Sequence, residues 1–232
     1  MGLIGADDPA SLFLAEQYWI PKMPKLRIIV VALNVEMFSY SDQSLPMEFF
    51  ESPGWKYDSL HQYWPEGVSD EFITDLNARP EPSTLASIIT NQGFTPKAPQ
   101  GWNADSVKLE KVWPYYVTFT ARERLFQAFV DTCKKHQIDV IGTIFPIHPG
   151  YAKMSSYGKS GISDSLIDSV LQYMVYLETT NSNFHFFDQN QYGNHDYTDE
   201  DAYDAYHLSA TGAKKYTRRL LTYLESKSLL SP

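Results

Sequence analysis

An aspartate and a histidine lie three residues apart near the C-terminal end of the sequence, in the run DAYHLSATGAKKYT over residues 204–217. Histidine is the commonest general base near neutral pH, and a neighbouring aspartate can orient its ring and stabilise its protonated form. Such a pair activates a serine hydroxyl, which is a poor nucleophile without a base. Asp204 and His207 are therefore candidates for the acid–base arm of a hydrolase. The alternative is a capped helix start with a polar residue in its first turn.

The elements around this pair predict an α/β fold. Three segments have the apolar, β-branched or aromatic composition of buried strands: residues 26–33, 138–146 and 184–187. Four segments have apolar residues at helical spacing: residues 11–20, 121–137, 163–177 and 208–227. Their alternation predicts a three-layer α/β/α domain with a mostly parallel sheet.

The loops after the predicted strands carry the other candidate site residues. Asn34 follows the first strand, His148 follows the second in the run FPIHPGY, and the 188–207 loop follows the third. Because working residues of parallel sheets lie at the carboxyl ends of the strands, we expect these segments to converge. His148 and Tyr151 are then candidate substrate contacts, and the alternative for His148 is a turn residue between two prolines.

Residues 38–120 interrupt this alternation and hold many of the prolines and tryptophans of the chain. Loops of this length are usually functional lids or subdomains. We interpret residues 1–232 as a single domain in which residues 38–120 form an aromatic insertion that shapes the substrate site. Aromatic residues make up 15% of the chain, which suits a surface that stacks on sugars but equally suits a tyrosine-rich core and rim.

Composition argues against several kinds of partner and cofactor. The net charge is −9 with no cluster of Lys and Arg, so we expect no nucleic-acid partner. No stretch approaches the roughly 20 apolar residues of a membrane span, and the N-terminus lacks the layout of a signal peptide. A single Cys133 excludes an internal disulfide, and no paired Cys or His motif indicates zinc. The acidic 188–204 loop lacks the spacing of a calcium loop, so we expect no metal and no cofactor.

The run DAYHLSATGAKKYT resembles the final block of the SGNH (GDSL-type) hydrolases, Asp-x-x-His-Leu-Ser/Thr-x-x-Gly. The resemblance implies an α/β/α fold and a Ser-His-Asp triad containing Asp204 and His207. The run MGLIGADD is similar to the second block, which implies a loop whose Gly5 donates its backbone N–H to the oxyanion hole. The run LRIIVVALN resembles the third block and implies Asn34 as a second donor, although Ala-Leu-Asn-Val replaces the usual Gly-x-Asn-Asp.

A second resemblance covers most of the C-terminal half. The runs GWNADSVKLEKVW, IFPIHPGY and NHDYTDEDAYDAYHL are similar to an uncharacterised paralogous family of large proteins from Fibrobacter, whose C-terminal region carries an SGNH-like pattern. This resemblance implies a cell-envelope, extracytoplasmic setting and a carbohydrate substrate. The expected activity is serine-dependent ester hydrolysis or acyl transfer, such as the removal of acetyl groups from polysaccharide.

The sequence lacks the first SGNH block, in which Gly-Asp-Ser or Gly-Ser-Ser carries the nucleophile. Three explanations stay open: a fragment whose serine lies upstream, an inactive carbohydrate-binding or scaffold module, or a substitute nucleophile among Ser39, Ser41 and Ser155. Because the first strand normally lies at the centre of the sheet, its absence predicts an unfilled position or an exposed apolar groove beside the 26–33 strand.

Overall fold

The structure is a computed structural model that describes residues 3–5, 12, 15–16, 20–33, 35, 38, 74, 97–102, 119–153 and 164–230. Most of the 38–120 insertion lies outside these residues. Four predicted or candidate site residues also lie outside them: Asn34, Ser39, Ser41 and Ser155.

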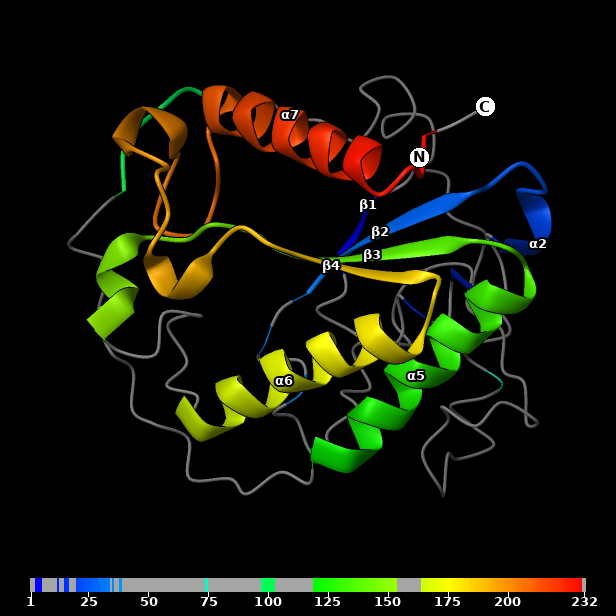
Figure 1. The fold of residues 1–232 in the computed structure, drawn as a ribbon. Helices are drawn as coiled ribbons and strands as arrows, with labels where there is room; N and C mark the ends of the chain where they lie inside the picture. The colour runs from blue at the N-terminus through cyan, green and yellow to red at the C-terminus, as the bar shows by residue number, and fades with distance from the viewer. Residues whose placement is uncertain are drawn as a thin grey trace.

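A parallel four-stranded sheet with the strand order β1-β2-β3-β4 forms the middle layer (Figure 1). Its strands are β1 (Leu3–Gly5), β2 (Ile28–Ala32), β3 (Asp139–Ile144) and β4 (Phe184–Asp188). In β2, Ile29 and Val31 belong to one hydrophobic cluster and Val30 to the other. The strand is therefore buried on both faces, which is why its sequence is continuously apolar.

Helices cover both faces of this sheet (Figure 1). The helices α5 (Phe119–Lys135) and α6 (Asp164–Thr180) lie on one face, and α7 (Ala210–Ser226) lies on the other. The short elements are α2 (Ile20–Lys22) and the 3₁₀ turns η6 (Pro149–Lys153), η7 (Gln191–Gly193) and η8 (Asp199–Asp201). The predicted three-layer α/β/α class is confirmed.

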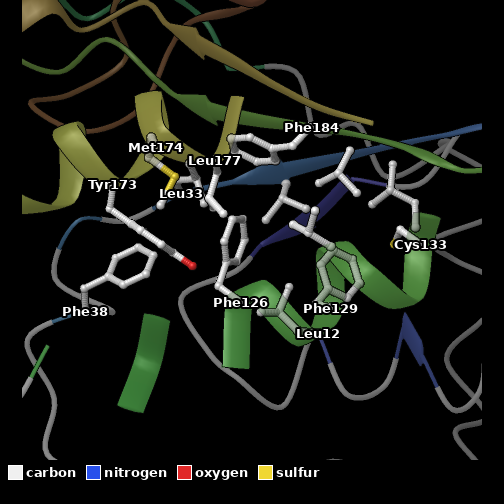
Figure 2. Packing of buried hydrophobic residues seen from close by; sticks show 14 of the residues in the cluster. Leu12, Leu33, Phe38, Phe126, Phe129, Cys133, Tyr173, Met174, Leu177 and Phe184 are labelled. Atoms are coloured by element: carbon white, nitrogen blue, oxygen red, sulfur yellow. The ribbon is translucent and has the colours of Figure 1, made fainter. Parts of the chain in front are cut away.

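Two hydrophobic clusters join the layers. The larger one packs α5 and α6 against the sheet, and Figure 2 shows Phe126 among its labelled aromatic residues. Phe126 meets Phe38 at 6.1 Å and Phe184 at 5.7 Å between ring centroids, both edge-on. The smaller cluster packs Tyr216 and Leu220 of α7 against the opposite face. These contacts fix where the loops at the carboxyl ends of the strands begin.

Side chains from both helical layers cap the outer edge of β4. The Tyr223 hydroxyl lies 3.0 Å from the main-chain oxygen of Phe186 and 3.2 Å from the Glu178 carboxylate. The Lys227 ammonium donates to the same carboxylate at 2.9 Å. The outward-facing carbonyl of Phe186 thus has a partner without another strand.

Two expectations about the N-terminal segment are wrong. Leu3 to Gly5 pair in parallel register with Val30 to Ala32, so the sheet position beside β2 is filled along these three residues. Gly5 is consequently the last residue of a strand and not part of a loop. The main-chain pairing with β2 produces this strand. The segment is too short for its sequence to show the hydrophobic periodicity of a strand.

Candidate acid–base site

Asp204 and His207 form a hydrogen-bonded pair. The Nδ1 atom of His207 lies 2.9 Å from each carboxylate oxygen of Asp204. The Oδ1 atom of this carboxylate also accepts the main-chain N–H groups of Tyr206 and His207, each at 2.8 Å. Because a charged carboxylate is only an acceptor, the proton of the neutral ring is on Nδ1 and Nε2 carries a free lone pair. The turn therefore presents an oriented imidazole base.

The base is open to solvent. The side chain of His207 is 71% exposed and that of Asp204 is 38% exposed. Within the part of the chain that the structure describes, no group hydrogen-bonds to Nε2 of His207. Burial alone would raise the pKa of Asp204, but the hydrogen bonds from Tyr206 and His207 outweigh burial and lower it. The carboxylate thus stays charged when it supports the ring.

The rest of the Leu-Ser-x-x-Gly run has a structural explanation. Ser209 is the N-cap of α7: its hydroxyl accepts from the N–H of Gly212 at 3.2 Å and donates to the carbonyl of Glu200 at 2.8 Å. A Cβ atom at position 212 would lie 2.0 Å from the main-chain oxygen of Asp201. Serine and glycine therefore let α7 start directly against η8, which places the turn that holds His207.

The loop after β3 lies against this turn. The main-chain N–H of His148 donates to the carbonyl of Ala205 at 2.9 Å. The hydroxyl groups of Tyr151 and Tyr206 hydrogen-bond, with 5.5 Å between the ring centroids. The predicted convergence of the loops after β3 and β4 is confirmed by these contacts.

The two predicted substrate contacts have different surroundings. His148 is half-buried, and its Nδ1 accepts the N–H of Gly150 at 2.7 Å, as a turn residue would. Tyr151 is fully buried and packs against His148 and Tyr206, so it could meet a substrate only if neighbouring side chains moved. Their binding roles stay predictions.

The predicted oxyanion donors are only partly described. Gly5 ends β1 at the carboxyl edge of the sheet, the edge from which the loops after β3 and β4 also leave. Asn34 lies outside the described residues. The structure therefore places Gly5 on the expected edge, and its role as an N–H donor stays a prediction.

Two aromatic side chains next to the site were missed as site residues from the sequence, Trp102 and His195. Their rings lie 5.8 Å apart, and Trp102 also contacts the ring of His148 at 6.2 Å. The indole N–H of Trp102 donates to the carbonyl of Tyr197 at 3.2 Å. No local pattern links these residues, because they meet only when the 97–102 segment packs against the loop after β4.

Three acidic residues of the 188–204 loop bind neighbouring protein groups. Asp196 pairs with Arg219 at 2.7 Å, and Asp201 pairs with Lys215 at 3.0 Å. Asp199 accepts the main-chain N–H of Trp102 at 3.1 Å. Among the described residues, no three His, Cys, Asp or Glu side chains come together as metal ligands. The carboxylates instead fasten the loop to α7 and to the 97–102 segment.

No family model, no curated protein and no solved structure matches the chain. In the described part of the chain, every helix is too short or too polar to cross a bilayer.

Proposed function

We propose that this protein is a serine-dependent ester hydrolase or acyltransferase of SGNH type that acts on carbohydrate esters such as acetylated polysaccharide. The observation that carries the proposal is the Asp204–His207 pair, with Nδ1 held by the carboxylate and Nε2 open to solvent. The carbohydrate substrate and the cell-envelope setting come from the sequence resemblance alone.

The pair supports a two-step acyl transfer. His207 Nε2 takes the proton of a serine hydroxyl while the serine oxygen attacks the ester carbonyl. The imidazolium, stabilised by Asp204, then gives that proton to the leaving alkoxide. Water or an acceptor hydroxyl repeats the sequence on the acyl-enzyme. Gly5 and Asn34 are the proposed oxyanion donors, and removing one such donor costs about 3–4 kcal/mol in known enzymes.

The identity of the nucleophile is a separate part of the proposal. Among the described residues, no serine hydroxyl hydrogen-bonds to His207. The candidates within this sequence are Ser39, Ser41 and Ser155, and a serine from a preceding segment is the alternative. Either source would have to bring its hydroxyl to the open Nε2.

The first experiment measures hydrolysis of p-nitrophenyl acetate and of acetylated xylan. We expect His207→Ala to lower kcat/KM by about 10²–10⁴, the range for a general base. His136→Ala is the matched control, because His136 is an exposed histidine directly after α5. It reports the background hydrolysis that any surface imidazole gives. Equal rates for His207→Ala and the unaltered protein would overturn the catalytic role.

The second experiment identifies the nucleophile. A fluorophosphonate probe that reacts with activated serines is added, and the labelled peptide is located by mass spectrometry. We expect one labelled serine, and we expect the label to disappear in His207→Ala. If neither turnover nor labelling occurs, either the serine belongs to a preceding segment or the protein is a non-catalytic carbohydrate-binding or scaffold module. Direct binding of acetylated and deacetylated xylan would then test that description.

A further inference from the structure

We infer that His195 is a positioning residue for the Asp204–His207 turn through its contact with Ile147, and that protonation of its ring breaks its second contact, with the main chain of Tyr197. The inference gains its functional meaning from the proposed function. The contacts themselves are independent of any ester chemistry and can be tested without a substrate.

The two ring nitrogens of His195 have opposite hydrogen-bonding roles. Its Nε2 lies 2.7 Å from the carbonyl oxygen of Ile147, which can only accept. Its Nδ1 lies 3.3 Å from the main-chain N–H of Tyr197, which can only donate. The neutral ring with its proton on Nε2 satisfies both contacts. A second proton on Nδ1 would point at the N–H of Tyr197 and abolish that hydrogen bond.

These contacts lead directly to the acid–base turn. Ile147, which His195 holds, is followed by His148, whose N–H donates to the carbonyl of Ala205 at 2.9 Å. Ala205 lies inside the turn between Asp204 and His207. His195 thus joins the loop after β3 to the loop after β4, and its contact lies one residue from one of the bonds that hold the turn.

Packing around His195 keeps the ring in this orientation. Its centroid lies 5.8 Å from that of Trp102 and 5.5 Å from that of Tyr197. The Trp102 indole donates to the carbonyl of Tyr197 and the His195 ring accepts from its N–H, so both rings are hydrogen-bonded to the main chain of Tyr197. The half-buried imidazole therefore has few alternative positions.

The charged groups near His195 oppose one another. Burial lowers the pKa of His195, and the ammonium of Lys215 on α7 acts in the same direction. The carbonyl of Ile147 and the carboxylate of Asp196 act against it, and the net pKa is below the ordinary value. The other imidazole near His195 belongs to His148, which contacts Trp102 as well. The neutral ring is therefore the form that fits the folded loop.

The sign of the pH dependence follows from this lowered pKa. The contribution of His195 is fully present above the ordinary histidine pKa of about 6.5 and is lost as the pH falls through the lowered folded value. Because any histidine base also loses activity in acid, a rate profile alone does not separate His195 from His207. The test therefore measures the hydrogen bonds of the loop and not the reaction rate.

The experiment is amide hydrogen exchange by NMR across the acid limb. The reporters are the amides of Tyr197 and His148, and the amide of Val140, which donates to Asn183 within the sheet region, is the internal reference. We expect the protection of the Tyr197 amide to fall with the titration of His195, by up to about tenfold per pH unit. The His148 amide should keep its protection, because the Nε2–H contact with Ile147 is present in both protonation states. Val140 should keep its protection over this range.

Two variants distinguish an effect of the His195 ring from a general change in the fold. His195→Gln keeps an N–H that can reach Ile147 but has no titratable group, so the reporters should keep the same protection at every pH. His136→Gln should behave as the unaltered protein. A pH-dependent loss that persists in His195→Gln would overturn the inference. If this variant does not fold, the ring nitrogen signals of the unaltered protein still decide, because a proton on Nδ1 at neutral pH would contradict the proposed tautomer.

The result is distinguishable from failure of the proposed function. Loss of protection with His195 titration, together with normal ester turnover in His207→Ala, would retain the positioning contact and remove the catalytic role. The opposite pair of results would retain the catalytic base and remove the positioning role of His195.

Discussion

Replacing Gly212 with alanine should destabilise the protein, although alanine is the better helix former. The new Cβ atom would lie 2.0 Å from the main-chain oxygen of Asp201 and 2.8 Å from its carbonyl carbon. These are backbone atoms, so no side-chain rotation can relieve the contact. The first turn of α7 must therefore move away from η8.

Three effects determine the expected change in the free energy of unfolding. Alanine gains up to about 1 kcal/mol over glycine in a helix. Forcing an extra methyl group into a packed site costs about 1–3 kcal/mol. The movement also strains the Ser209 cap, which bonds to Gly212 and to Asp201, and losing a cap costs about 1 kcal/mol. We expect the free energy of unfolding to fall by about 1–3 kcal/mol on balance.

Urea unfolding followed by circular dichroism measures this change. Thr211→Ala is the matched control, because Thr211 is the exposed neighbour in the same helical turn and should change stability by no more than about 0.5 kcal/mol. A Gly212→Ala protein as stable as the unaltered one would refute the close approach of α7 to η8. It would also reopen the question of why the Leu-Ser-x-x-Gly run contains its glycine.

Two further predictions concern polar groups. Thr143→Val should lower the free energy of unfolding by about 1–3 kcal/mol, because it leaves the buried hydroxyl of Tyr216, which lies 2.5 Å from Thr143 Oγ1, without that partner. Adding Tyr216→Phe should recover part of this loss when the two variants and the double variant are compared by urea unfolding. Purely additive losses would contradict the coupling between the two hydroxyl groups. The lowered pKa of Asp204 means that its stabilising contribution is present above the ordinary aspartate pKa of about 3.9 and is lost as the pH falls through the folded value. Asp204→Asn should therefore flatten the acid limb of the unfolding free energy, and an unchanged limb would show that the turn does not depend on this carboxylate.

The fold was largely predictable because its elements have strong local signals. The apolar run at residues 26–33 contains β2, and the helical spacing at 121–137 closely matches α5 (Phe119–Lys135). The strand β1 was missed because three residues show no period, and they become a strand only through pairing with β2. Local composition therefore predicted the layers but not the whole sheet.

The same distinction applies to the site. Asp204 and His207 are three residues apart in one turn, so their contact could be predicted from spacing. His195 and Trp102 come from distant parts of the chain, and their contact depends on tertiary packing that no short pattern encodes. The acidic residues around them resembled possible metal ligands in sequence, whereas Asp196 and Asp201 form ion pairs with α7.

The capped edge of β4 protects this side of the sheet from further pairing. An additional strand beside β4 would first have to displace Tyr223 from the main-chain oxygen of Phe186 and from Glu178, together with the Lys227–Glu178 ion pair. Exposed strand edges are the usual templates for edge-to-edge association, and charged side chains are a common protection. Edge-to-edge association through β4 is therefore disfavoured by side chains that the chain itself supplies.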